Sequence, residues 1–221
     1  MLELCCGSAQ LTAACIDEGL SAVGADWNNR FSTLAPWVKV NLADMVGCGQ
    51  ILQVIEQSAS TLVVVWFGLP CGTASRARDI QDRPRLPPEL RSEQFPLGLP
   101  GLVGDDLAKV SAANAVYRAA CVIIKKCDEL KVPWAIEGPL RSYMWYITWM
   151  ADLLLLCGAH DVCYQACMVG GKRDKRQRIR TSSTACDQFQ GLWCTRDHPH
   201  EPWRRGNRLM TSFEAEYPKK F

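Results

Sequence analysis

The sequence contains no low-complexity segment and no repeat of fixed period, which favours an ordinary globular chain over a disordered one. No secretory signal opens it, and its 12 cysteines lack the regular framework of a small secreted domain. We therefore expect a reducing intracellular compartment, nucleus or cytoplasm. The longest apolar run, residues 145–157, is interrupted by Asp152 and is shorter than the ~20 residues of a bilayer span. It predicts a buried helix and no membrane contact.

Length and charge distribution bound what remains. At 221 residues the chain is long enough for one domain with a substantial core, and we expect a small appendage beside it. The net charge of +2 is uninformative, but basic residues concentrate in one short stretch. Its members are Lys172, Arg173, Lys175, Arg176, Arg178 and Arg180. Such a stretch favours a polyanionic partner.

A short apolar run ends in a turn that carries a cysteine. Residues 61–67 are rich in β-branched side chains, which predicts a central parallel strand covered on both faces. Gly68, Pro70 and Gly72 then break the pattern. Cys71 follows the carboxyl end of the strand, where open α/β sheets bind ligands. It is a candidate nucleophile, although a buried structural cysteine is the common alternative.

The first 26 residues have the pattern of a nucleoside-binding unit. A strand that begins at Leu2 runs into a turn of small residues around Gly7, and a helix is expected over residues 9–18. A second strand, over residues 21–25, precedes Asp26. In doubly wound folds such a turn lets the backbone approach a ligand, and the carboxylate accepts hydrogen bonds from ribose hydroxyls. A tight turn beside a surface aspartate is the alternative.

The middle of the chain continues this alternation. A strand over residues 39–42 and a helix over residues 51–57 lead to the central strand, which predicts right-handed crossovers and a parallel sheet. Residues 76–104 are rich in proline and glycine, and we expect a long loop that is either a lid over the site or a disordered insertion. A helix is expected over residues 105–130.

Glu137 follows the next predicted strand, over residues 134–136. At the same sheet edge as Cys71, it would place a carboxyl and a thiol in one pocket. Alternatively, it favours the N-terminus of the following helix, expected over residues 140–156 and buried. Strands over residues 159–167 and 179–183 complete the predicted sheet.

Taken in order, these segments resemble the motifs of the cytosine-5 DNA methyltransferase family. Leu2-Glu3-Leu4-Cys5-Cys6-Gly7-Ser8-Ala9 is similar to its first, cofactor-binding motif, and Asp26-Trp27 to the pair that holds ribose and adenine. Gly68-Leu69-Pro70-Cys71 resembles the nucleophile motif, and Glu137-Gly138-Pro139 the glutamate motif. Lys175-Arg176-Gln177-Arg178-Ile179 resembles the strand with two arginines.

The resemblance implies a Rossmann-like class I methyltransferase fold, a mostly parallel α/β sheet with helices on both faces, over residues 1–183. It implies methyl transfer from S-adenosyl-L-methionine to C5 of cytosine in DNA, through a covalent adduct at C6. The implied catalytic residues are Cys71, Glu137, Arg176 and Arg178. The implied cofactor-binding residues are Leu4, Cys5, Gly7, Ser8, Ala9, Asp26, Trp27, Gly68 and Pro70. The target base would be flipped out of a duplex.

The chain also departs from the family pattern. Gly72, Gly138 and Asp174 stand where the family has Gln, Asn and Gln, and residues 184–221 are too few for the usual target-recognition domain. The resemblance favours DNA over RNA as the partner. An RNA cytosine-5 methyltransferase would use the same residues. A catalytically inactive module that binds nucleic acid or a protein is the third reading.

The last 38 residues contain further metal-ligand types. Cys186, Cys194, His198 and His200 lie close in sequence, and a zinc site is conceivable. Zinc modules usually show Cys-x2-4-Cys spacing, which is absent, so we predict no metal site. We expect this short C-terminal extension to pack Trp193, Trp203 and Phe213 against the sheet.

Overall fold

The computed structural model describes residues 1–28, 34–80, 86–205, 208–209 and 217. A seven-stranded sheet with the order β3-β2-β1-β4-β5-β7-β6 organises this part of the chain, and only β7 runs antiparallel to its neighbours. The strands are β1 (Leu2–Leu4), β2 (Val23–Asp26), β3 (Trp37–Lys39), β4 (Val65–Phe67), β5 (Trp134–Pro139), β6 (His160–Gln165) and β7 (Arg176–Thr181). The predicted Rossmann-like methyltransferase fold is confirmed.

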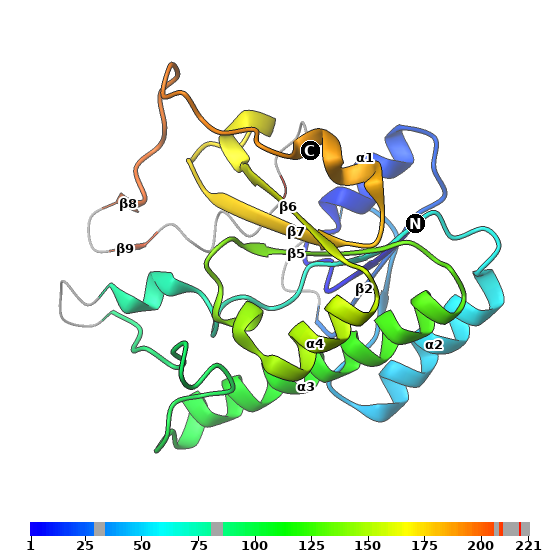
Figure 1. Ribbon diagram of the computed structural model, residues 1–221, viewed down its shortest axis with the longest axis horizontal. Helices are drawn as coiled ribbons and strands as arrows, with labels where there is room; N and C mark the ends of the chain where they lie inside the picture. The colour runs from blue at the N-terminus through cyan, green and yellow to red at the C-terminus, as the bar shows by residue number, and fades with distance from the viewer. Residues whose placement is uncertain (29–33, 81–85, 206–207, 210–216, 218–221) are drawn as a thin grey trace.

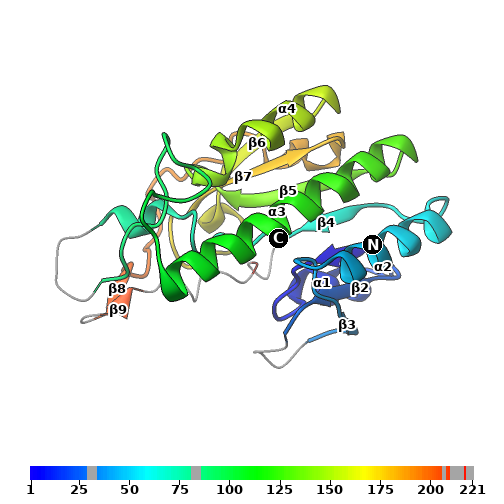
Figure 2. The same ribbon diagram turned by 90° about the horizontal axis from the view of Figure 1, so that it is seen from below.

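Helices cover both faces of this sheet. α2 (Met45–Ser58), α3 (Gly104–Glu129) and α4 (Thr148–Leu156) lie along one face, and α1 (Gln10–Asp17) lies on the other (Figure 1). Seen from below, the strands run side by side from β3 at one end to β6 at the other (Figure 2). Side-chain alternation along β4 explains the two layers: Val65 and Phe67 pack with α2, α3 and α4, whereas Trp66 packs with Leu11 of α1.

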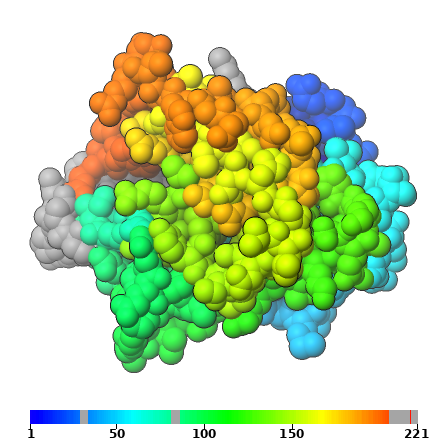
Figure 3. Space-filling model, viewed as in Figure 1, coloured from blue at the N-terminus to red at the C-terminus, as the bar shows by residue number. Residues whose placement is uncertain are grey.

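Short 3-10 segments complete the fold. They are η1 (Arg76–Asp79), η2 (Tyr143–Tyr146), η3 (Ala166–Val169) and η4 (Thr184–Phe189), and a two-stranded ribbon joins β8 (Arg204–Arg205) to β9 (Arg208–Leu209). Figure 3 shows the residues after β7 packed over β6 and η3. Of the three aromatic residues expected to anchor this extension, Trp193 is 44% exposed, Trp203 is partly buried, and Phe213 lies outside the described residues.

The prediction that Glu137 follows its strand is wrong. β5 extends to Pro139 because β7 pairs with it beyond the end of β4, with Glu137 opposite Ile179 and Gly138 opposite Arg178. The basic stretch likewise forms most of β7 instead of preceding it. Glu137 is therefore fixed by ladder hydrogen bonds on a central strand, which makes its position more rigid than that of a loop residue.

Other boundaries differ for local reasons. The third strand is Trp37–Lys39, earlier than expected, and α2 begins at Met45, where the Asp44 carboxylate accepts a hydrogen bond from the Gly47 amide. The single helix expected over residues 140–156 is divided, because Ile147 has an extended backbone between η2 and α4. The prediction that this helix is buried is also wrong at its C-terminal end, where the Leu155 and Leu156 side chains are 78% and 84% exposed.

The second half of the long loop is anchored to the core, so it is not a disordered insertion. Arg91 is 1% exposed, and its guanidinium donates to Thr73 Oγ1 at 3.0 Å, to Asn114 Oδ1 at 2.7 Å and to the Pro96 carbonyl at 2.5 Å. A buried cation needs several acceptors, and Arg91 finds them on three segments. The loop is thereby tied both to α3 and to the turn that carries Cys71.

Within the described part of the chain, one helix, α3, has the length and apolar composition to cross a membrane. Its apolar side chains have another role in this fold. Tyr117, Ala120, Ile123 and Ile124 are fully buried in the core beneath the sheet. Core helices of globular domains share this composition, so the feature is weak evidence for a membrane span.

Candidate active site

A cavity of about 790 Å³ opens at the carboxyl ends of β1, β4 and β5. Its volume is within the range of about 300–1,000 Å³ that is typical of small-ligand sites. The turn after β1 contributes Cys5, Cys6, Gly7 and Ser8, and the turn after β4 contributes Gly68, Leu69, Pro70, Cys71 and Gly72. The remaining walls include Glu137 and Pro139 of β5, Lys175 and Arg176 at the start of β7, and Trp203 and Tyr217.

The turn after β1 is conformationally unusual. Cys5, Gly7 and Ala9 all have positive φ angles, of 59°, 54° and 55°. For Cys5 and Ala9 this backbone costs about 1–2 kcal/mol each, because a β-carbon crowds the carbonyl in the left-handed region. Strain of this kind is retained where the surrounding fold over-determines it, often at ligand-binding turns. Two of these positive-φ residues, Cys5 and Gly7, lie in the cavity wall.

Asp26 lies at the back of this turn. Its Oδ2 accepts a hydrogen bond of 2.9 Å from the Gly7 amide, and its Oδ1 accepts one of 3.3 Å from the Asn28 amide. The turn and the acid 19 residues later, which the sequence assigns to one nucleoside-binding unit, are thus joined by a hydrogen bond. Asp26 and the 54%-exposed Trp27 do not belong to the cavity wall, however, and Leu4 and Ala9 are fully buried beneath it. Asp26 supports the turn from outside the cavity.

Two buried residues hold the turn that carries Cys71. The Tyr117 hydroxyl donates to the Pro70 carbonyl at 2.7 Å, and Arg91 fixes Thr73. Gly68 brings this turn against the first one, since a β-carbon there would lie 3.1 Å from the Cys5 carbonyl oxygen. The thiol is consequently placed by packing on both sides and is partly exposed to the cavity.

Cys71, Glu137 and Lys175 interact electrostatically. Burial raises the pKa of the Cys71 thiol; the Lys175 ammonium opposes this shift, and the Glu137 carboxyl adds to it. Burial also raises the pKa of Glu137, again opposed by Lys175. A thiol and a carboxyl that share one cation form the kind of coupled group found at catalytic sites.

Glu137 has an oxygen with no internal partner. Its Oε1 is buried and makes no hydrogen bond within the described part of the chain. A buried polar atom left in this state costs about 1–3 kcal/mol, so an oxygen of this kind in a cavity wall gains from a bound partner. Because Glu137 lines the cavity, the missing partner would come from a molecule bound there.

The two predicted arginines have different surroundings. Arg176 is exposed and lines the cavity. Arg178 shares its face of β7, as the spacing predicted, but its guanidinium lies 3.3 Å from Asp161 Oδ2 and 5.3 Å above the Trp145 ring. The same Asp161 pairs with Arg180. Arg178 is thus engaged outside the cavity, and Lys175 stands beside Arg176 instead.

Several wall residues were not anticipated from the sequence. They are Lys175, Asp174, Arg76, Arg78, Arg141, Trp203 and Tyr217. Lys175 directly precedes the arginine motif, which was the one available signal. Tyr217 arrives from the C-terminal tail and accepts a hydrogen bond of 2.6 Å from Trp66 Nε1. From the sequence we expect the C-terminal extension to pack against the sheet, but no local pattern places Tyr217 at this cavity.

Packing does not account for two departures from the family pattern. A β-carbon at Gly138 would lie 2.3 Å from Met144 Cε, the far end of a flexible side chain that can shift, and 3.3 Å from Trp145 Cζ2. At Gly72 a β-carbon would meet nothing within 4 Å. Nothing in the structure explains either glycine.

The sheet order and the helices on both of its faces define a Rossmann-like methyltransferase fold. No family model matches the chain, and no curated protein matches it. Among solved structures, a mutant DNMT2 from Spodoptera frugiperda aligns at 15% identity with a TM-score of 0.44, over 94% of this chain and 56% of the other. The Entamoeba histolytica methyltransferase EhMeth aligns at 11% identity with a TM-score of 0.43, over 81% of this chain and 51% of the other. The chain thus spans about half the length of either structure.

Proposed function

We propose that this chain is an S-adenosylmethionine-dependent methyltransferase that modifies C5 of cytosine in DNA. The observation that carries the proposal is the meeting of a thiol, a carboxyl and a cation in one cavity. Cys71, Glu137 and Lys175 come from three distant parts of the chain and line the same cavity. A nucleophile, an acid and a charge that couples them are the parts a covalent base-modifying reaction requires.

The turn after β1 fits the cofactor. Cys5 and Gly7, both with positive φ angles, line the cavity, and Ser8 and Gly68 border the same space. These residues would hold S-adenosylmethionine, with Asp26 supporting the turn through the Gly7 amide. When bound, the cofactor supplies an electrophilic methyl group.

The protein's own residues perform the rest of the chemistry. The Cys71 thiolate forms a bond from Sγ to C6 of cytosine, which moves ring electrons toward C5 and N3. Glu137, whose raised pKa favours its protonated form, donates a hydrogen bond to N3 and satisfies its orphaned oxygen on the exocyclic amine. Once C5 carries the transferred methyl group, loss of the C5 proton to solvent returns an electron pair to the C5–C6 bond and expels Cys71 as thiolate.

The charge of the cavity wall favours a nucleic-acid substrate. Five basic residues line it against two acids, Glu137 and Asp174. The basic residues are Arg76, Arg78, Arg141, Lys175 and Arg176. Arginine and lysine at the mouth of a pocket attract phosphates, and a base must leave its helix to reach Cys71.

A mechanism-based trap tests the reaction. A cytosine that carries fluorine at C5 has no proton there to lose, so the Cys71 adduct would remain covalent after methylation. We expect a denaturant-resistant complex of the chain with a 5-fluorocytosine DNA duplex in the presence of S-adenosylmethionine, and none with Cys71→Ser. Cys163→Ser, a thiol outside the cavity, is the matched control. Trapping of the equivalent RNA alone would instead identify an RNA methyltransferase.

Cofactor binding separates an enzyme from a module without chemistry. Calorimetric titration with S-adenosylmethionine should give affinity in the micromolar range, weakened about tenfold by Asp26→Ala, because the Gly7 turn loses its carboxylate support. Absence of binding by a well-folded chain would contradict the enzymatic proposal. It would favour a methyltransferase-like module that binds nucleic acid or a protein.

A further inference from the structure

A second group of reactive side chains lies away from the cavity. Cys167 belongs to η3, whereas Cys194, His198 and His200 follow η4 near the C-terminus. One ligand atom from each of the four lies within 4.8 Å of every other. Cys186, the fourth member considered from the sequence, is instead buried against β6 and β7 in the core. The fold thus exchanges Cys186 for a cysteine 27 residues before Cys194 in the chain.

We propose that Cys167, Cys194, His198 and His200 bind a zinc ion. Bond lengths of about 2.3 Å to sulfur and about 2.0–2.1 Å to nitrogen in a tetrahedron set sulfur–nitrogen separations near 3.6 Å and nitrogen–nitrogen separations near 3.3 Å. The Cys194 Sγ lies 3.7 Å from His198 Nε2 and 3.4 Å from His200 Nε2. The two Nε2 atoms are 3.1 Å apart.

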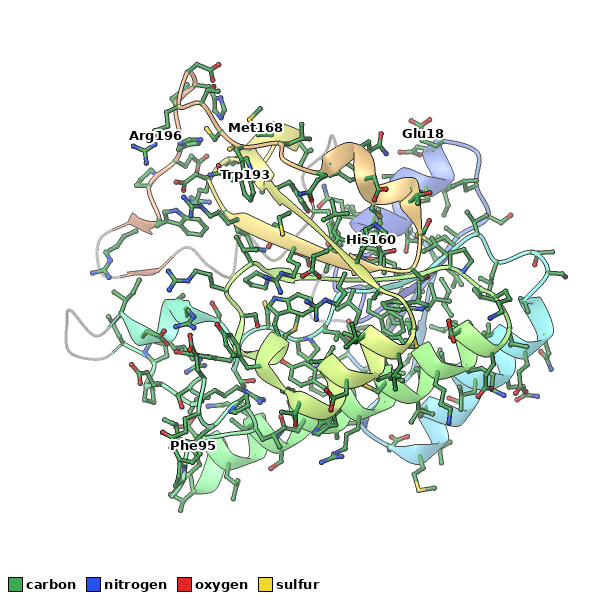
Figure 4. The ribbon with its side chains drawn as sticks, in the orientation of Figure 1. Glu18, Phe95, His160, Met168, Trp193 and Arg196 are labelled. Atoms are coloured by element: carbon green, nitrogen blue, oxygen red, sulfur yellow. The ribbon has the colours of Figure 1, made fainter. Side chains whose placement is uncertain are left out.

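The groups around these ligands also suit a metal. Asp197 Oδ1 lies 2.9 Å from His198 Nδ1, so the outer nitrogen of that ring has a carboxylate partner while Nε2 faces the cluster. The Arg196 amide donates to Cys194 Sγ at 3.2 Å, in a turn made possible by the positive φ of Arg196. An amide donor to sulfur stabilises the thiolate that zinc requires. Met168, Trp193 and Arg196, which flank the ligands, lie in the same region of Figure 4.

The ligand chemistry favours a structural zinc ion. Two sulfurs and two nitrogens in tetrahedral arrangement are typical of zinc, and four protein ligands leave no open position for a substrate. The ligands also come from two segments, η3 and the extension, so the ion would join them. The proposal concerns this cluster alone and does not depend on methyl transfer.

The ion would fix one wall of the cavity. Beyond His200, the Glu201 carboxylate pairs at 2.8 Å with the buried Arg173, and Trp203 Nε1 donates to Asp174 Oδ1 at 2.8 Å. Asp174 and Trp203 both line the cavity, as does the neighbouring Lys175. Holding the extension to η3 therefore holds these residues in place.

Metal content of the full chain tests the site. Protein purified without chelator should contain about one zinc ion, and cobalt in its place should give the visible and thiolate charge-transfer bands of a tetrahedral S2N2 site. Cys167→Ser and Cys194→Ser should lose the metal, whereas Cys163→Ser and Cys186→Ser should retain it. Asp197→Asn leaves all four ligands and should weaken zinc binding about tenfold.

Protease sensitivity tests the structural role. Removal of zinc should increase tryptic cleavage after the exposed Arg196 about tenfold, and returning zinc should reverse the change. A chain with neither bound zinc nor the cobalt spectrum would overturn the proposal. So would a disulfide between Cys167 and Cys194, or loss of metal from Cys186→Ser with retention in Cys167→Ser.

Discussion

The two ends of the cavity are built from different materials. At the β1 end the wall residues Cys5 and Gly7 have left-handed backbone conformations, and the Asp26 carboxylate accepts a hydrogen bond from the Gly7 amide. At the β5–β7 end the wall includes the charged side chains Glu137 and Lys175. We call the first the backbone end and the second the charged end. Under the proposed function the backbone end would hold the cofactor, and the charged end would serve proton movement and anion attraction.

Removal of the proposed nucleophile, Cys71, should have the largest effect on methyl transfer. Cys71→Ser should lower methyl transfer by about a thousandfold or more, because a hydroxyl is far less nucleophilic toward C6 and leaves less readily. Cofactor affinity should stay nearly unchanged, since the turn after β1 keeps its geometry. Activity is measured by transfer of a labelled methyl group and affinity by calorimetry; equal activity in the serine variant would exclude the covalent route.

Loss of the acid at the charged end should have the next largest effect. Glu137→Gln should slow transfer about 10²–10³-fold, because an amide cannot protonate N3. Burial, opposed by Lys175, raises the pKa of Glu137, so wild-type activity should fall as pH rises through that raised pKa, and the variant should lack this limb. Methyl-transfer rates measured against pH check both the slower transfer and the missing fall at high pH, with the surface variant Glu129→Gln as control. An unchanged profile would remove Glu137 from the reaction.

The same comparison explains which parts could be predicted from the sequence. The turn after β1 follows from local pattern and spacing, since a strand, a turn and a helix are each specified by adjacent residues; the bond from Gly7 to Asp26 was not predicted. The placement of Cys71 beyond β4 was predictable for the same reason. Both depend on short stretches whose periodicity changes at a glycine or proline.

The charged end was less predictable because it depends on long-range pairing. β7 inserts between β5 and β6, which extends β5 through Glu137 and brings Asp161 next to Arg178 and Arg180. One-dimensional spacing cannot reveal that Arg178 is neutralised by a neighbouring strand while Lys175 faces the cavity. The arrival of Tyr217, 151 residues after its partner Trp66, depends on tertiary structure in the same way.

The backbone end depends on a buried carboxyl. Glu3 is fully buried, its Oε2 accepts hydrogen bonds from the Thr12 amide and hydroxyl, and burial raises its pKa from 4.5 to about 7. The folded chain therefore keeps a proton between these values that the unfolded chain releases. The contribution of Glu3 to stability should therefore be greatest below pH 4.5, fall as pH rises through 7, and then level off.

Glu3→Gln tests this pH dependence. The neutral amide should remove the slope, so that the variant is more stable than the wild type above pH 7 by up to about 3 kcal/mol. Urea unfolding at pH 5, 7 and 8 gives the measurement. Asp17→Asn, on the same helix that Glu3 supports but exposed, is the control. If the free energy of unfolding depends on pH in the same way for Glu3→Gln and wild type, then the pKa of Glu3 does not change on folding.

Substitution of Lys175 changes the charge beside the Cys71 thiol without removing a reacting atom. Its ammonium opposes the burial that raises the pKa of the Cys71 thiol. Lys175→Gln should therefore slow alkylation of Cys71 by iodoacetamide about tenfold at fixed pH, and shift the reaction profile to higher pH. Lys172→Gln, whose side chain is 73% exposed, should leave the rate unchanged. Equal alkylation rates for the two variants would show that Lys175 does not influence the pKa of the Cys71 thiol.

The smallest predicted effect tests the backbone end by itself. Gly7 and Gly72 each have open space where a β-carbon would stand, but only Gly7 has a positive φ, of 54°. Gly7→Ala should therefore destabilise the chain by about 1 kcal/mol and lower Tm by about 2–4 °C, whereas Gly72→Ala should be nearly neutral. Since sterics are equal, any difference between the two isolates the cost of backbone conformation. If that conformation binds the cofactor, Gly7→Ala should also weaken S-adenosylmethionine binding while leaving the alkylation rate of Cys71 unchanged. Unchanged cofactor binding with a changed alkylation rate would contradict the assignment of the cofactor to the backbone end.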